Sequence, residues 1–308
     1  MDQNEVSEIR EMSATQVDST RDAVVIPSQD NIVTTPSAEQ LPCPTCSGAA
    51  SVPPSYVYAL GRMEARFPSP SVEKEYAQAT GRTDTVGLTD RQTLQAVLSK
   101  RENRYLVRQL CWVLTIEGLE TYLLQPRNPG DFDLLVEALR PTPSPLDVDV
   151  VIGTRETIAP PELCNGLMIP IVLFDQIYSF DRDAVIQAVP RPENMSAEEF
   201  APVVRELFDR NMQLADNAGS TDDHRALNYL VMRYPAIYAT AAEWYGRDSS
   251  LTGVEVRPSR LSGVRKIVDV IFSYTNRKTD VADKNFARVD VTGEFPFLVT
   301  KMSPYYDR

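Results

Sequence analysis

Two cysteines separated by two residues stand near the start of the chain, in the segment Leu41-Pro42-Cys43-Pro44-Thr45-Cys46. Such a pair, held in a tight turn, directs two thiolates at one point and is typical of a zinc knuckle. The other cysteines of the chain are Cys111 and Cys164. We therefore predict a structural zinc ion on Cys43 and Cys46. The remaining ligands would be Cys164 and Cys111 of the same chain, or the Cys43 and Cys46 of a second copy in a homodimer.

The two later cysteines differ in their surroundings. Cys111 lies in an apolar stretch, where a cysteine is commonly a small core residue. Cys164 stands beside Asn165 and Gly166 in a turn, which is better suited to a metal ligand. Inert thiols and redox or disulfide chemistry remain open alternatives for these residues.

A thiol enzyme is the catalytic alternative. It would use Cys164 as nucleophile, activated by His224 and oriented by Asp222 or Asp223. His224 is the one histidine of the chain. It falls at the expected start of a helix, where a histidine is commonly a surface or capping residue, and the spacing does not support the constellation. The interpretation is a protein without catalytic residues, with a thiol- or metal-dependent peptide-tailoring enzyme as the alternative.

Other charged residues have local explanations. Carboxylates fall at a hairpin turn, in the first turn of a helix and after an apolar strand, but their spacing does not indicate a particular metal ion. They are Glu117 and Glu120, Asp131 and Asp133, and Asp175, Asp181 and Asp183. A basic group brackets the turn between two expected strands and could receive an acidic peptide, although a solvated hairpin end is the simpler explanation. It comprises Arg257, Arg260, Arg265 and Lys266.

Composition bounds the class of protein. The chain has 308 residues, is 43% hydrophobic and carries a formal net charge of −12, which does not fit a phosphate-binding surface. Its first 40 residues hold eight acidic and two basic side chains and no aromatic residue. We predict a disordered acidic tail over residues 1–40 and a single folded domain over residues 41–308. Because no apolar run could span a bilayer and no signal peptide is evident, a cytoplasmic protein with reduced thiols is expected.

The residue pattern predicts an α+β fold with a mixed or antiparallel sheet, a central helical segment and a C-terminal antiparallel β meander. The expected strands are 56–62, 105–116, 119–124, 147–152, 167–174, 251–257, 265–274, 285–291 and 297–301. The expected helices are 71–79, 90–101, 131–139, 183–188, 196–217, 221–233 and 235–245.

Several of these stretches resemble the C-terminal domain of unknown function in cyanobactin maturation proteases of the PatA and PatG type. They are the Cys43–Cys46 knuckle and residues 56–62, 87–91, 108–121, 161–166, 174–178, 268–277 and 297–308. In those proteins the domain follows a subtilisin-like protease, in pathways that cut and cyclise ribosomal peptides. The histidine and serine motifs of that protease are missing from this chain.

The resemblance therefore implies a non-catalytic accessory or scaffolding module that binds a precursor peptide or a partner enzyme. The expected binding residues are Asn165 and Gly166 in their loop, and Tyr305 and Tyr306 near the end of the chain, where exposed aromatic rings would anchor a peptide.

Overall fold

The computed structural model describes residues 54–83, 85–144, 146–189, 191, 195–212 and 216–306. The described residues belong to one compact unit. The predicted tail, its boundary with the predicted domain, Cys43 and Cys46 lie outside the described residues.

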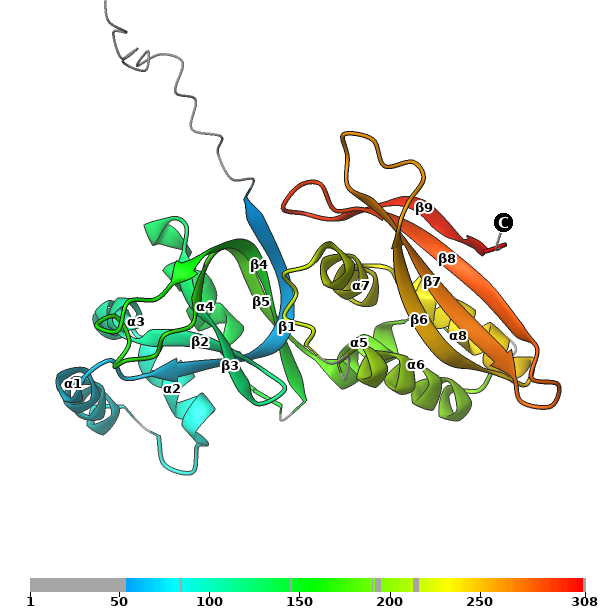
Figure 1. Ribbon diagram of the computed structural model, residues 1–308. Helices are drawn as coiled ribbons and strands as arrows, with labels where there is room; N and C mark the ends of the chain where they lie inside the picture. Colours follow the sequence, from blue (N-terminus) through cyan, green and yellow to red (C-terminus); the bar gives the residue numbers. More distant parts are fainter. Residues whose placement is uncertain are drawn as a thin grey trace, which may run out of the picture. The chain divides into compact units, whose positions relative to one another are not determined.

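Five strands of the first half close into a barrel in the order β1-β2-β3-β5-β4 (Figure 1). Neighbouring strands are antiparallel except β3 and β5, which are parallel, so the predicted mixed sheet is confirmed. The first half of β1 pairs with β4 and its second half with β2. The strands are β1 (Ser55–Arg66), β2 (Cys111–Ile116), β3 (Leu119–Pro126), β4 (Asp147–Ile158) and β5 (Pro170–Asp181).

Short helices accompany the barrel strands, and the first two of them start at side-chain caps. The Ser69 hydroxyl accepts the Val72 N–H at the start of α1, and Thr89 forms a capping box with Gln92 at the start of α2. The helices are α1 (Pro70–Gly81), α2 (Asp90–Leu98), α3 (Arg104–Gln109) and α4 (Phe132–Ala138), with the 3₁₀ turns η1 (Arg101–Asn103) and η2 (Pro129–Asp131).

One sequence expectation was wrong in this region. Residues 105–109 were expected in a strand but form α3, and β2 begins only at Cys111. Leu106 and Val107 are buried on the helix, and the Val107 carbonyl accepts the indole N–H of Trp112 at 2.8 Å. A short apolar run suits a buried helix turn as well as a strand, and the tertiary packing decides between them.

The second half of the chain places a helical segment before an antiparallel sheet in the order β6-β7-β8-β9, so the predicted C-terminal meander is confirmed. The α+β fold class is thereby confirmed as well. The helices are α5 (Arg182–Ala188), α6 (Ala197–Met212), α7 (Asp222–Arg233) and α8 (Ala236–Gly246). The strands are β6 (Ser249–Pro258), β7 (Ile267–Asn276), β8 (Ala282–Asp290) and β9 (Phe297–Pro304).

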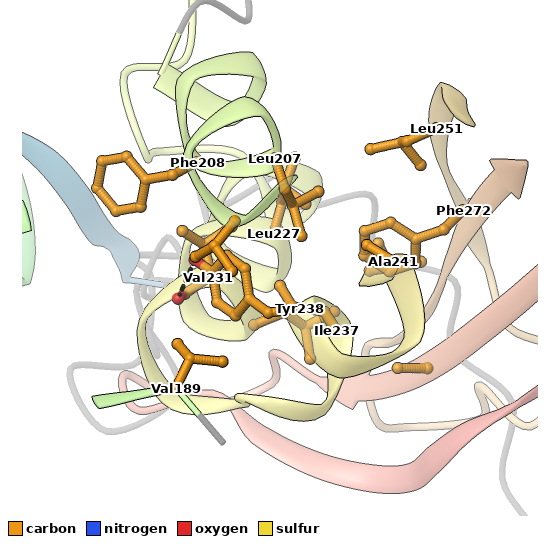
Figure 2. Close-up of a cluster of buried hydrophobic side chains, with 14 of the residues drawn as sticks. Val189, Leu207, Phe208, Leu227, Val231, Ile237, Tyr238, Ala241, Leu251 and Phe272 are labelled. Carbon is orange, nitrogen blue, oxygen red and sulfur yellow. Dashed lines mark hydrogen bonds between the residues drawn. The ribbon is translucent and has the colours of Figure 1, made fainter. Parts of the chain in front are cut away.

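A hydrophobic core joins these helices to the C-terminal sheet (Figure 2). Phe272 enters it from β7, and Leu207 and Phe208 enter it from α6. The hydroxyl of buried Tyr238 donates to the Val231 carbonyl at 2.8 Å, so the one polar atom of this side chain is satisfied.

Helix α7 packs on both β1 of the barrel and β7 of the sheet. The side-chain amide of buried Asn228 donates to the Tyr58 carbonyl at 2.8 Å and ties the helix to β1. Within the described ranges, every helix is too short or too polar to cross a lipid bilayer.

Candidate functional site

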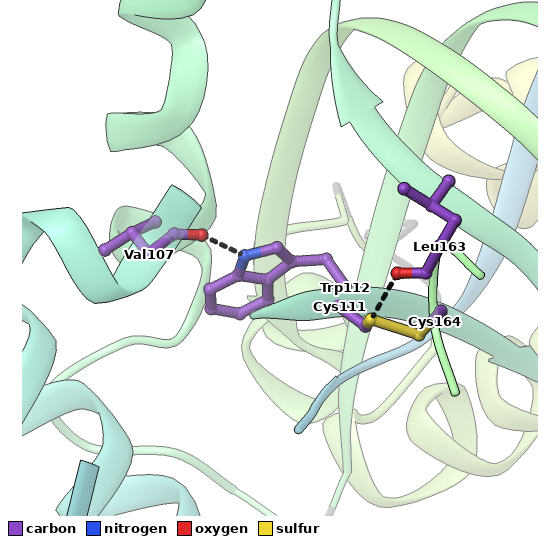
Figure 3. The surroundings of a disulfide bond; sticks show 5 residues. All are labelled: Val107, Cys111, Trp112, Leu163 and Cys164. Carbon is purple, nitrogen blue, oxygen red and sulfur yellow. Dashed lines mark hydrogen bonds between the residues drawn. A yellow bond between two sulfur atoms is a disulfide. The ribbon is translucent and has the colours of Figure 1, made fainter. Parts of the chain in front are cut away.

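The two cysteines of the described chain are bonded to each other (Figure 3). Cys111 opens β2 and Cys164 lies in the loop between β4 and β5, and their Cα atoms are 6.0 Å apart. Both side chains are buried, in a small cluster with Val113, Leu123 and Ala159. The bond closes a stretch of 53 residues and fixes the loop against the barrel.

This bond bears on the predicted zinc site. A sulfur in a disulfide is not a thiolate and does not ligate zinc, so Cys111 and Cys164 are unavailable as ligands in the state described here. Among the described residues no group of three or more histidine, cysteine, aspartate or glutamate side chains is placed to hold a metal ion. The prediction for Cys43 and Cys46 lies outside the described residues and stays a prediction.

The structure does not bring the components of the thiol-enzyme alternative together. Cys164 is bonded to Cys111, which pairs with Arg66 at the far end of β1, whereas the helix of His224 is tied to β1 at Tyr58. The backbone N–H of His224 donates to the Thr221 hydroxyl, which is a helix-capping contact. Burial lowers the pKa of the His224 imidazole.

Most of the predicted carboxylates form local contacts. Glu120 pairs with Arg66 at 2.7 Å across the strands β3 and β1, while Glu117 is exposed in the turn with a φ of 51°. Asp133 pairs with Arg104. The remaining contacts are Asn128 with Asp131 at 3.1 Å, the Asp183 N–H with Asp181 at 2.8 Å, and Arg205 with Asp183 at 3.5 Å.

Asp175 belongs to a cluster that joins the barrel to the loop between β8 and β9. Arg127, just after β3, lies 2.7 Å from Asp175 and 3.6 Å from Glu294, and it donates to the Thr154 hydroxyl at 2.7 Å. Burial, together with the neighbouring Asp175, raises the pKa of the Glu294 carboxyl. Sequence reasoning singled out Asp175 but not Glu294, which stands in a Gly-Glu-Phe-Pro turn without a local charge pattern.

The predicted basic group lies at the end of the C-terminal sheet that carries this loop. The backbone of Lys266 bonds to the next hairpin through the Val291 N–H at 2.8 Å and through the Thr292 hydroxyl at 2.7 Å. Arg265 pairs with Asp290 and lies over the Phe297 ring at 5.2 Å. Phe297 is half exposed beside it.

The other expected binding residues lie elsewhere. Asn165 and Gly166 have positive φ angles of 51° and 85° and line a cavity of about 270 Å³ beside the disulfide. Tyr306 is 78% exposed, whereas Tyr305 packs edge-on against Phe286 and is half-buried. A separate cavity of about 600 Å³ lies along the second half of β1 and is lined in part by Met63, Phe67, Tyr76, Arg91 and Leu94.

A closed mixed barrel, a helical segment and a four-stranded antiparallel sheet define the fold, and comparison with known proteins shows what the chain is similar to. Residues 194–305 match the family model described as PatG C-terminal. A solved structure titled "PatG Domain of Unknown Function" shares the fold, with a TM-score of 0.67 and 20% sequence identity over 82% of this chain and 98% of that chain. No curated protein matches the chain. The resemblance to the PatG C-terminal domain is thus confirmed.

Proposed function

We propose that this protein is a non-catalytic accessory module in the biosynthesis of ribosomally made peptides, where it binds a precursor peptide or a partner enzyme. The observation that carries the proposal is the match of residues 194–305 to the PatG C-terminal family model, supported by the shared fold. This domain type accompanies peptide-processing proteases, so a role beside their substrates or partners follows. A scaffold that assembles such enzymes would likewise bind its partners without catalysing a reaction.

The side chains that could have carried a reaction support a non-catalytic role. Cys164 is held in a buried disulfide, and Asp175 is engaged by Arg127. The carboxylate of Asp149, which is fully buried, is engaged by Arg91 at 3.2 Å and by the Met63 N–H at 2.5 Å. These interactions join strands and helices to one another and give each group a structural task.

A zinc ion and a homodimer complete the proposal. Cys43 and Cys46 would ligate zinc through two thiolates, and the same pair of a second copy would supply the other two ligands. Such a closed four-sulfur site is structural, since it leaves no position for a substrate. It would hold two chains together and present two binding surfaces to one peptide or enzyme.

The test uses the full chain together with the precursor peptides and processing enzymes encoded beside its gene. Each candidate is titrated against the chain by isothermal calorimetry, and each peptide is weighed by mass spectrometry after incubation. Binding with unchanged peptide mass is the expected result. A peptide whose mass changes would contradict the non-catalytic role. If none of the peptides and enzymes gave a heat of binding, the proposal itself would be contradicted.

A further inference from the structure

Two loops are bonded to each other at one end of the C-terminal sheet. The first connects β6 to β7 and the second connects β8 to β9, and the bonds of Lys266 to Val291 and Thr292 hold them together. Figure 1 shows both loops at the same end of the sheet. We call residues 257–266 and 295–299 the loop face.

The loop face exposes an unusual amount of apolar surface. Val264 is fully exposed, and four further apolar side chains show two fifths or more of their surface to solvent. They are Leu261 at 60%, Phe295 at 53%, Phe297 at 47% and Val299 at 40%. Single exposed apolar residues are ordinary, but a group contributed by two loops marks an interaction surface.

The first loop of this face is basic in sequence, although Arg257, Arg265 and Lys266 each pair with a carboxylate. Residues 257–266 carry four basic side chains and no acidic one, whereas the chain as a whole has a net charge of −12. Arg260 is exposed and forms no ion pair with another residue of the described ranges. The Arg260 guanidinium is therefore open to a carboxylate of an acidic partner.

The loop face is also held rigidly. The guanidinium of buried Arg225 donates to the carbonyl of Val291 at 2.8 Å, to that of Glu294 at 3.2 Å and to that of Gly293. The ring of Tyr56 packs against this guanidinium at 5.2 Å. A surface that is ordered beforehand binds with a smaller entropy cost.

The edge of β9 is closed to an added strand. The hydroxyls of Tyr229 and Tyr234 accept the backbone N–H groups of Leu298 and Met302 at 3.2 and 2.9 Å. A partner at this end of the sheet would therefore contact side chains of the loop face rather than extend the sheet.

We propose that the loop face is the docking surface for an acidic peptide segment that also carries apolar side chains, such as a precursor leader. This inference rests on the proposed function and gives the chemistry of its partner. Apolar side chains of the peptide would pack on Leu261, Val264 and Phe295. Its carboxylates would pair with the surrounding basic groups, of which Arg260 is open to such a contact.

The probe is a fluorescein-labelled synthetic peptide of glutamate and leucine, titrated against the full chain by fluorescence anisotropy. Two matched peptides replace glutamate with lysine or leucine with serine. The Glu/Leu peptide is expected to bind and both matched peptides to bind at least about tenfold more weakly, because each lacks one of the two contacts. Equal binding of the lysine peptide would overturn the assignment.

Variants at fully solvated positions test the location without threatening the fold. Arg260→Glu is expected to weaken binding about tenfold, and Val264→Ser about fivefold. The matched controls are Arg101→Glu and Val86→Ser, which change the same residue types at exposed positions outside the loop face and should leave binding unchanged. Equal effects of the two sets would overturn the inference.

Anionic lipid is the other chemistry that would suit a basic and apolar surface. Vesicles containing phosphatidylserine are therefore titrated in parallel, and binding to vesicles without binding to the Glu/Leu peptide would overturn the peptide assignment. The proposed function is tested separately. A cognate peptide that binds Arg260→Glu and Val264→Ser as well as the unaltered chain would refute the loop face while preserving the accessory role.

Discussion

The carboxyl groups of Asp175 and Glu294 share one guanidinium, that of Arg127, although they belong to a barrel strand and to a loop of the C-terminal sheet. Arg127 holds the pKa of Asp175 below its usual value through a direct hydrogen bond. Burial, together with the neighbouring Asp175, raises the pKa of Glu294 to about 7. The contact that steadies one side of the loop is therefore sensitive to pH.

The pH dependence of stability follows from these directions. Because the pKa of Glu294 is raised in the folded protein, this carboxyl group stabilises the fold below its unfolded pKa of 4.5. That stabilisation is lost as the pH rises through about 7. Because the pKa of Asp175 is lowered, its protonation changes the stability of the fold only in more acidic solution. We expect Glu294 to reduce the free energy of unfolding by about 1 kcal/mol between about pH 5 and about pH 7.5, allowing for solvent screening. Urea denaturation across this range measures it.

The comparison of wild type with Glu294→Gln isolates this group. Burial lowers the pKa of His224, which gives a contribution to stability of opposite sign. The difference between the two proteins removes the histidine term, because both contain it. The difference in the free energy of unfolding between wild type and variant should change with pH for Glu294→Gln. It should not change for the exposed control Glu137→Gln. A difference that is flat with pH for Glu294→Gln would refute the shared-guanidinium account.

The buried pair of Arg91 and Asp149 predicts a large loss on breaking. Asp149 is fully buried, burial raises its pKa, and Arg91 also donates to the Ala138 carbonyl at 3.2 Å. Arg91→Met leaves this carboxyl without its counter-charge and should lower the free energy of unfolding by about 3–5 kcal/mol. Arg104 forms an exposed ion pair with Asp133 and serves as the control. Arg104→Met should lower the free energy of unfolding by less than about 1 kcal/mol.

The double variant Arg91→Met with Asp149→Asn completes the cycle. Removing the charge from both partners should recover part of the loss seen for Arg91→Met, since no unpaired charge then remains buried. Equal stabilities of the Arg91→Met and Arg104→Met proteins would contradict the buried-pair interpretation.

The disulfide between Cys111 and Cys164 should stabilise the barrel. Closing 53 residues in the unfolded chain corresponds to about 4 kcal/mol in the loop-entropy description. Reductant should therefore lower the urea midpoint of the wild type and leave that of a Cys111→Ser, Cys164→Ser variant unchanged. Non-reducing peptide mapping should recover the two residues in linked peptides. Recovery of both as free thiols would be the contrary result.

Metal content tests the zinc proposal. Protein purified without chelator should contain about half a zinc ion per chain and have the mass of a dimer, because two Cys43–Cys46 pairs would share one ion. Cys43→Ser with Cys46→Ser should remove both zinc and dimer, whereas Cys111→Ser with Cys164→Ser should remove neither. About one zinc per chain that disappears in the latter variant would instead indicate an intramolecular site.

Local patterns in the sequence anticipate much of the fold. Thr89 and Thr221 cap helices as expected, whereas the cap of α1 is Ser69 and not the expected Ser71. The alternation of Val268, Val270 and Phe272 marks the covered face of β7. Barrel closure is not anticipated, because the parallel pairing of β3 with β5 depends on contacts between strands distant in sequence.

The sites were harder to predict for the same reason. The basic turn at Arg260 was noticed, but Phe295 and Phe297 come from another hairpin and meet it only after folding. The bond between Cys111 and Cys164 likewise joins segments 53 residues apart, and the expected cytoplasmic environment favoured reduced thiols. Spacing along a chain does not record such encounters.

Hydrogen exchange of the full chain with and without the Glu/Leu peptide tests the central claim, that this module binds acidic peptides at the loop face. The account predicts slower exchange in residues 259–266 and 291–299 when the peptide is present, and little change in residues 62–67 and 90–94 beside the cavity along β1. Protection confined to the segments beside that cavity, or unchanged exchange throughout at saturating peptide, would contradict it.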